Sequence, residues 1–243
     1  VGLTLGECDA VIAAAARTGG LVAVNHELRV SQQWKAVRDI VAAGDIGPVR
    51  YQHMSLFRHS FRQGSGGWRY NPQEVGSWVL EELVHFFDLV MWYAAENGRP
   101  ARVHTVGNGG AGGLVRNFGA TLEWADGSVA MLSQCLSGFE HHTLLEVAGE
   151  DGAVRTWWSG AMDRTLHPEF ALTVRRRGRE PETLDIPPSG EAFELEENLR
   201  YALSGFREGR SSFSPQEARL AVEVCLAADE AHRTGVAVDL PPL

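Results

Sequence analysis

Residues 67–93 read GWRYNPQEVGSWVLEELVHFFDLVMWY, and the second half of this stretch decides the fold. Almost every position over residues 77–95 is apolar, which predicts a helix that is buried on most of its sides. The same helix carries four ionisable residues, Glu81, Glu82, His85 and Asp88. Burying a carboxylate costs several kcal/mol unless the group is paired, hydrogen-bonded or protonated. A polar stripe on this apolar helix therefore needs a structural or chemical explanation.

Glu81, His85 and Asp88 are spaced i, i+4, i+7, so they are expected to share one face of the helix. One interpretation is a buried Glu81–His85 pair that fixes the packing of neighbouring strands. The other is an acid/base pair that faces a pocket, because a nearby carboxylate orients the imidazole and stabilises its charged form for proton transfer. The spacing leaves both interpretations open.

A metal site is a third interpretation, since Glu82 and His85 have the Glu-x-x-His spacing of di-iron bundles. Those sites need a second copy of the motif and further glutamate ligands, and the sequence has no second copy. The three cysteines, at positions 8, 135 and 225, are too far apart for a zinc knuckle or a disulfide framework. We therefore predict no metal site.

The composition narrows the class of protein. A hydrophobic content of 44% and a charged content of 22% over 243 residues are typical of a soluble globular chain. The formal net charge of -9 argues against nucleic acid as a partner. No apolar run is long enough to span a bilayer, and widely spaced cysteines favour a reducing cytoplasm.

Residues 5–25 are predicted to end one structural unit, and residues 31–57 are predicted to begin another. Residues 5–18 predict an amphipathic helix, and residues 21–25 (LVAVN) predict a short strand of the buried, parallel kind. A helix followed by such a strand is typical of the tail of an α/β unit. Residues 31–43 predict a further helix, and residues 49–57 predict a strand.

The chain after residue 95 alternates between apolar and polar residues and contains Asp-Gly turns, which predicts hairpin-connected strands. Such strands form a mainly antiparallel sheet. Helices at residues 191–208 and about 215–233 would cover one face of it, which gives an α+β fold. The expected strands lie at residues 101–107, 117–124, 128–137, 142–148, 154–158, 170–176 and 182–186.

Two loops carry possible functional signals. Residues 58–76 form a long loop in which Trp68, Arg69 and Tyr70 suit contact with a ligand, although the loop could equally pack on its own aromatic residues. Residues 107–112 match the string G-x-G-x-x-G. A dinucleotide fingerprint requires a helix after this string, whereas residue 114 leads into a strand, so we interpret it as a loop between strands.

Taken in order, four segments resemble the glucose-fructose oxidoreductase/inositol dehydrogenase (Gfo/Idh/MocA) family. The residues NHELR are similar to the strand and arginine that follow its nucleotide domain, and AAGDIGP is similar to its G-x-I-G turn. GSWVLEELVHFFD is similar to its helix that ends in H-x-x-D, and SPQEA with a later Thr-Gly is similar to its closing helix. These segments begin at residues 25, 42, 76 and 214.

Members of this family join an N-terminal Rossmann domain, which binds NAD or NADP, to a C-terminal open sheet with the substrate site. The resemblance implies an α+β domain at residues 27–243, with a large, mainly antiparallel open sheet and helices on one face. Residues 1–26 would be the remnant of the Rossmann domain, namely its last helix and strand. It also implies a homo-dimer or tetramer that forms through the sheet.

By resemblance, His85 is the general base or proton relay for the hydroxyl group that is oxidised. Glu81 takes the place of the family's usual aspartate and would orient His85. The substrate would be a sugar, a cyclitol or a related polyol. Further candidates for the lining of the pocket are Arg29, Trp68, Arg69 and His142.

The nucleotide fingerprint and the E-K-P lysine of the family do not occur in this chain, whose one lysine, Lys35, has a different context. We therefore expect a fragment or a natural truncation that does not bind NAD(P) well alone. Three functions stay open. The chain could be the substrate domain of an NAD(P)-dependent oxidoreductase, a non-catalytic binding or oligomerisation module, or a cofactor-independent lyase or isomerase that uses His85 and Glu81.

Overall fold

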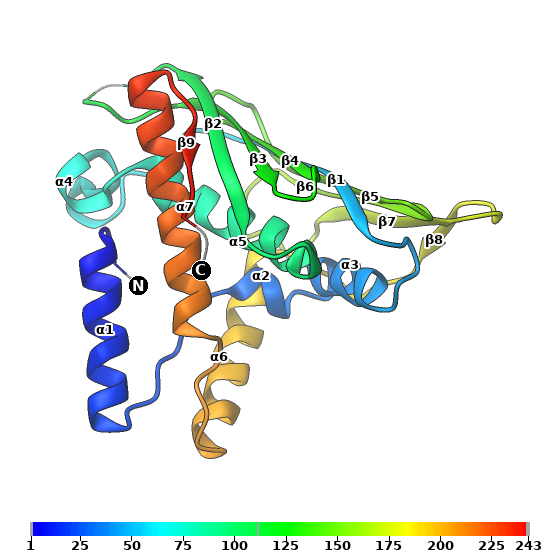
Figure 1. The fold of residues 1–243 in the computed structure, drawn as a ribbon, viewed down its shortest axis with the longest axis horizontal. Helices are drawn as coiled ribbons and strands as arrows, with labels where there is room; N and C mark the ends of the chain where they lie inside the picture. The colour runs from blue at the N-terminus through cyan, green and yellow to red at the C-terminus, as the bar shows by residue number, and fades with distance from the viewer. Residues whose placement is uncertain (1, 111, 242–243) are drawn as a thin grey trace.

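One open sheet of nine strands organises the computed structural model, which describes residues 2–110 and 112–241 (Figure 1). The strand order is β8-β7-β6-β5-β1-β4-β3-β2-β9. Only β1 and β4 pair in parallel, and all other neighbours are antiparallel. The strands are β1 Val49–Phe57, β2 Pro100–Asn108, β3 Asn117–Trp124, β4 Val129–Cys135, β5 His141–Gly149, β6 Gly152–Gly160, β7 Glu169–Arg176, β8 Glu182–Leu184 and β9 Val238–Asp239.

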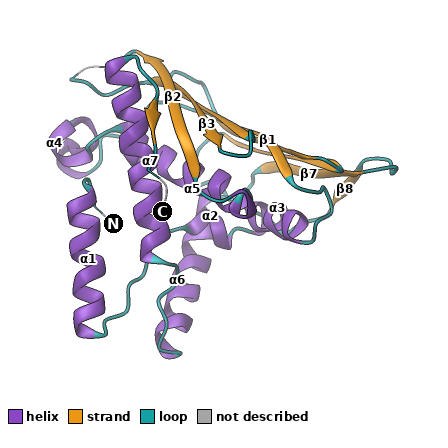
Figure 2. Ribbon diagram, viewed as in Figure 1, coloured by secondary structure: helices purple, strands orange, loops and turns teal. Residues whose placement is uncertain are grey.

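The helices lie on one side of the sheet, and the opposite face carries none within the described residues (Figure 2). The α+β fold with an open, mainly antiparallel sheet is therefore confirmed. No helix in the described ranges is both long enough and apolar enough to cross a membrane. The α-helices are α1 Leu5–Thr18, α2 Glu27–Val30, α3 Gln32–Ala42, α4 Pro72–Val75, α5 Val84–Tyr93, α6 Glu191–Arg207 and α7 Pro215–Thr234.

The main core lies between the sheet and α5. Phe87, Leu89 and Val90 of α5 are fully buried, in one cluster with Met54 of β1 and Leu132 of β4. This explains why the central helix is apolar on most sides: the sheet covers one side and neighbouring helices cover others. It also places the polar residues of this helix at the edge of the core.

The central helix begins with a wide π-helical turn, η2, at Val79–Leu83, before α5 starts at Val84. The amide of Val84 donates to the carbonyl of Val79, five residues earlier. The sequence predicted one regular helix over residues 77–95, so the π turn is a departure from that prediction. Such turns are frequent at functional sites, and this one carries Glu81 and Glu82.

Residues 21–25 form no strand, which corrects the prediction of a buried parallel strand. A strand needs a neighbour for its backbone groups, and no strand of the described chain lies beside this segment. The amides of Val22 and Val24 donate instead to the hydroxyls of Ser211 and Ser212, at 3.0 and 3.1 Å. The segment is therefore held by side chains of the α6–α7 connection.

The long loop that follows β1 contains a short 3₁₀ helix, η1 Ser65–Tyr70, and α4. It surrounds a second, smaller core that includes Phe61 and Trp78, with Trp68 packed against it. The Trp78 indole donates to the carbonyl of Arg69 at 2.8 Å, and the Tyr70 hydroxyl donates to the carbonyl of Phe61 at 2.8 Å. The loop therefore packs on its own aromatic residues, and its Arg69 also lines the cavity described below, whereas contact with a ligand stays a prediction.

A buried ion pair joins α2 to α5. The Arg29 guanidinium donates to both carboxylate oxygens of Asp88 at 2.7 Å, and to Glu217 of α7 at 2.7 Å. Arg29 is 9% exposed and Asp88 is 2% exposed. His26 lies 3.2 Å from the same carboxylate. Arg29 therefore holds three helices together.

The substitution Arg29→Ala should lower the free energy of unfolding by about 3–5 kcal/mol, because it leaves the Asp88 carboxylate buried without its main partner. Urea denaturation monitored by circular dichroism measures the change. Lys35→Ala is the control, since Lys35 pairs with Asp39 at the surface, and its effect should stay below about 0.5 kcal/mol. Equal, small effects of both substitutions would contradict a structural role for Arg29.

Candidate functional site

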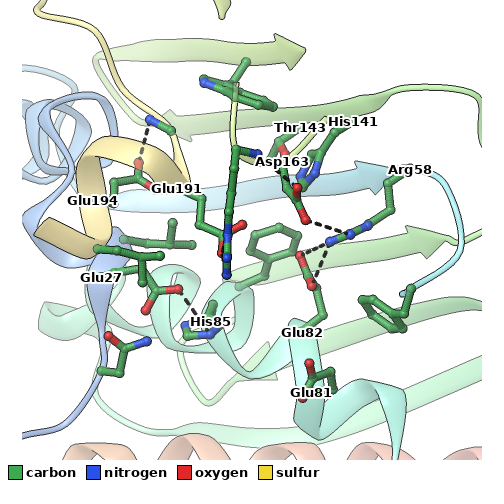
Figure 3. Close-up of a pocket in the computed structure, with 18 of the residues that line it drawn as sticks. Glu27, Arg58, Glu81, Glu82, His85, His141, Thr143, Asp163, Glu191 and Glu194 are labelled. Atoms are coloured by element: carbon green, nitrogen blue, oxygen red, sulfur yellow. Dashed lines mark hydrogen bonds and ion pairs between the residues drawn. The ribbon is translucent and has the colours of Figure 1, made fainter. Parts of the chain in front are cut away.

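A cavity of about 420 Å³ opens on the covered side of the sheet, between β1, β5 and β6 and the segments α2, η2, α5 and α6 (Figure 3). Its lining is rich in charge, because the central helix and the loop after β1 both direct polar side chains into it. The charged and titratable lining residues are Glu27, Arg58, Arg62, Arg69, Glu81, Glu82, His85, His141, Asp163, Arg164, Glu191 and Glu194.

His85 lies in this cavity, and its carboxylate partner is Glu27. The Nε2 atom of His85 is 3.4 Å from Oε1 of Glu27, and Figure 3 shows the two side chains side by side. Glu27 is the first residue of α2 and is 9% exposed. The sequence predicted Glu81 as the residue that orients His85, and this pairing is wrong because Glu81 is held elsewhere.

Glu81 also lines the cavity, but it forms an ion pair with Arg69, whose Nε lies 2.6 Å from its Oε1. The guanidinium of Arg69 stacks over the ring of Trp68, 5.1 Å from the ring centroid. Trp68 does not line this cavity; it faces a second, smaller hollow beside Leu3 and Leu80. Trp68 therefore positions Arg69 and has no access to a ligand in the main cavity.

Arg58 connects two carboxylates across the cavity. Its Nη1 lies 3.0 Å from Glu82, and its Nη2 lies 3.4 Å from Asp163, which also binds Arg62 at 3.0 Å. Burial raises the pKa of Glu82 above its ordinary value, although the charge of Arg58 opposes the shift. Burial also acts to raise the pKa of Asp163, but Arg58 and Arg62 outweigh it and leave that pKa lowered.

The sequence pointed to His142, but the structure places His141 in the cavity. Successive residues of a strand face opposite sides of the sheet. His141 lies on the covered side with Thr143, and both line the cavity. His142 faces the open side and stacks on Trp157, with ring centroids 6.2 Å apart. Burial lowers the pKa of His141 to about 4, so this ring is neutral at pH 7.

Arg29, which the sequence also suggested for the lining, does not reach the cavity. Its guanidinium is occupied by Asp88 and Glu217. Of the six residues selected from the sequence, the structure therefore brings His85, Glu81 and Arg69 together in the cavity. Glu27, Arg58 and Asp163 were missed; Glu27 lies in the NHELR segment and Arg58 in the loop at residues 58–76, whereas no sequence signal marks Asp163.

Glu194 is a buried acid of the cavity. It lies in the first turn of α6 and accepts hydrogen bonds from the Ser189 hydroxyl at 3.0 Å and the Gly190 amide at 3.2 Å. Burial raises its pKa from 4.5 to about 7, since these hydrogen bonds only partly offset the loss of water.

The described residues do not fit a dinucleotide or a metal. The G-x-G-x-x-G string at residues 107–112, of which residue 111 lies outside the described residues, stands between β2 and β3 with no helix after it. Lys35 is at the surface of α3 with Asp39. No group of three or more His, Cys, Asp or Glu side chains in residues 2–110 and 112–241 is placed to hold a metal ion.

The substitution Glu194→Gln should change how stability depends on pH. Because the folded-state pKa is raised, the stability that the protonated carboxyl contributes is present below pH 4.5 and is lost as pH rises through about 7. Between about pH 5 and about pH 8, the wild type should therefore lose about 3 kcal/mol of unfolding free energy relative to the variant.

Denaturant unfolding of both proteins at the two pH values gives this difference. Glu196→Gln on the exposed side of α6 is the matched control and should follow the wild type at both pH values. A constant difference between wild type and Glu194→Gln across the range would show that the Glu194 carboxyl does not titrate within it.

Comparison with known proteins gives the family. A family model described as the GFO/IDH/MocA C-terminal domain matches residues 34–155. No curated protein sequence matches the chain. An aldose-aldose oxidoreductase from Caulobacter crescentus, solved with glycerol, is 19% identical over 98% of this chain and 70% of its own, with a TM-score of 0.80.

Two further solved structures have the same fold. An inositol dehydrogenase homolog from Azotobacter vinelandii, complexed with NAD+, is 19% identical over 98% of this chain and 69% of its own, with a TM-score of 0.78. An oxidoreductase domain protein from Kribbella flavida is 16% identical over 99% of this chain and 72% of its own, with a TM-score of 0.81. Together with the family model, which matches half of the chain, they confirm the resemblance: this chain belongs to the GFO/IDH/MocA family, and residues 34–155 match its C-terminal domain.

Proposed function

We propose that the chain is the substrate-binding part of an NAD(P)-dependent oxidoreductase that acts on a sugar, a cyclitol or a related polyol. The observation that carries the proposal is the His85–Glu27 pair inside a polar cavity of about 420 Å³. A cavity of this size can enclose a small polyol. The neighbours solved with glycerol and with NAD+ support this substrate and cofactor class.

His85 is the proposed acid/base residue. Its neutral imidazole would accept the proton of the reacting hydroxyl, and the Glu27 carboxylate would stabilise the imidazolium that forms. The 3.4 Å separation of the two groups is long for a hydrogen bond. Such contacts commonly shorten once a substrate is bound. Glu81 and Arg69, which also line the cavity, would then hold further hydroxyl groups.

By resemblance, the cofactor is NAD or NADP, which supplies hydride acceptance when it is bound. Because the described residues offer no dinucleotide site, the proposal assigns cofactor binding to residues other than these. It divides the chain into residues 1–26, the last part of a nucleotide-binding domain, and residues 27–243, the substrate domain. The position of α1 away from the sheet in Figure 1 supports this division.

We also propose that the chain forms a homo-dimer or tetramer through the open face of its sheet. Tyr51, Phe57 and Met131 are exposed on this face, and apolar sheet surfaces of this kind tend to be covered by a partner. The three cysteines are free, so the proposed setting is a reducing cytoplasm.

The His85 proposal is tested by ligand-observed NMR titration with glucose, myo-inositol and glycerol. At least one polyol should bind in a saturable manner, and His85→Ala should weaken that binding by about threefold to tenfold, the value of one hydrogen bond. His142→Ala is the matched control, since this neighbour of His141 lies on the opposite face of the sheet and should leave binding unchanged.

Three results separate the alternatives. Binding that responds only to His85→Ala supports the proposed site, and titration of NADH and NADPH into the same chain then shows whether cofactor binding also resides here. Equal effects of both substitutions would contradict the assignment of the cavity. No binding of any polyol would favour a non-catalytic oligomerisation module.

The substitution Met131→Lys places a charge on the open face and should shift the chain toward monomers, because a buried, unpaired ammonium is costly at an interface. Analytical ultracentrifugation at several protein concentrations measures the distribution. Leu199→Lys, on the exposed side of α6, is the control and should not change it. A wild type that is monomeric at all concentrations would contradict assembly through the sheet.

A further inference from the structure

Every arginine that lines the cavity is already paired with a carboxylate of the same cavity. Arg69 binds Glu81, and Arg164 binds Glu191 at 2.7 Å. Arg58 and Arg62 share Asp163, and Arg58 also binds Glu82. An anionic ligand would therefore compete with a carboxylate of the cavity for every arginine in this lining.

Two acids of the lining have no arginine partner in the described structure, Glu27 and Glu194. Glu194 is satisfied by the Ser189 hydroxyl and the Gly190 amide. Glu27 is different, because its Oε1 lies near His85 whereas its Oε2 is buried without a hydrogen-bond partner among the described residues. A buried acceptor without a donor is unfavourable, so a ligand that brings a donor to it gains affinity.

The position of Glu27 shows which part of a ligand it would meet. In Figure 3 its carboxylate lies beside His85, whereas Arg58, Glu82 and Asp163 gather at the other end of the cavity. A substrate whose reacting hydroxyl faces His85 would therefore place an adjacent substituent at Glu27. That substituent has to be a hydrogen-bond donor, since Glu27 offers only acceptor atoms.

We propose that Glu27 is the residue that selects the substrate: its Oε2 accepts a hydrogen bond from a hydroxyl or ammonium group, and the cavity excludes sugars that carry a carboxylate or phosphate. The inference rests on the proposed polyol site, and it specifies that the substrate of this site is a neutral or cationic sugar. An ammonium group forms the stronger bond, because both partners are then charged. An acid group would face a buried carboxylate that has no cation to balance it.

The test compares glucose with two pyranoses that each differ from it at one carbon: glucosamine, which has an ammonium group at C2, and glucuronate, which has a carboxylate at C6. Their dissociation constants are measured with the wild-type chain by NMR titration near pH 7. Glucosamine should bind at least as tightly as glucose. Glucuronate should bind more weakly than glucose by about tenfold or more, the effect of one unfavourable charged contact.

The substitution Glu27→Gln keeps the size of the side chain and removes its charge. It should weaken the binding of glucosamine by about tenfold, change that of glucose by less than about threefold, and narrow the gap between glucose and glucuronate. Glu146→Gln is the control, because Glu146 lies on the open face of β5 beside Arg155 and should leave all three constants unchanged.

Glucuronate that binds the wild type as tightly as glucose would overturn the inference and leave the polyol site intact. Glucosamine binding that is insensitive to Glu27→Gln would also overturn it. Failure of all three sugars to bind would instead contradict the proposed function on which the inference rests. The three dissociation constants of the wild type show by themselves whether the cavity disfavours an anionic sugar. This comparison therefore remains valid even if the Glu27→Gln variant fails to fold.

Discussion

The structure depends on the requirement that buried charges on the central helix find partners. A buried carboxylate without a partner is strongly destabilising because it has lost its hydration. Each carboxylate and the one histidine of η2 and α5 therefore pair with a charged side chain from a different segment. The partners come from α2, from the strand–loop junction after β1 and from η1, and together they fix where these segments lie. The four pairs are Glu81–Arg69, Glu82–Arg58, His85–Glu27 and Asp88–Arg29.

Most of the fold could be predicted from the sequence, because apolar periodicity and turn residues are local signals. The strands after residue 100 and the helices α1, α3, α6 and α7 lie within a few residues of their predicted bounds. The strand predicted at residues 21–25 fails for a non-local reason, since an apolar run becomes a strand only beside another strand. The π turn at Val79–Leu83 also has no periodic signature that separates it from an α-helix.

The residues of the candidate site could be predicted in part, but their pairings could not. The sequence identified His85 and a nearby carboxylate, and the i, i+4 rule selected Glu81 as that carboxylate. In the structure Glu81 pairs with Arg69 and not with His85, because a guanidinium is the stronger partner for a carboxylate. Arg69 comes from a loop whose path only the tertiary structure shows. The sequence could have shown that His141, and not His142, faces the covered side of the sheet. Thr143, Leu145 and Val147 alternate along β5 with more exposed residues, and His141 shares their side of the strand.

The Arg29–Asp88 pair and the His85–Glu27 pair are linked, because α2 supplies one residue to each. This helix has four residues, too few to be stable by its own hydrogen bonds, so its position depends on what anchors it. Arg29 supplies the anchor through Asp88 and Glu217, and Glu27 stands two residues before Arg29 on the same turn. On the partner helix, His85 stands three residues before Asp88. The two helices are therefore joined by two pairs, one buried and rigid and one open to the cavity. The position of Glu27 beside His85 therefore depends on the Arg29–Asp88 pair, which does not line the cavity.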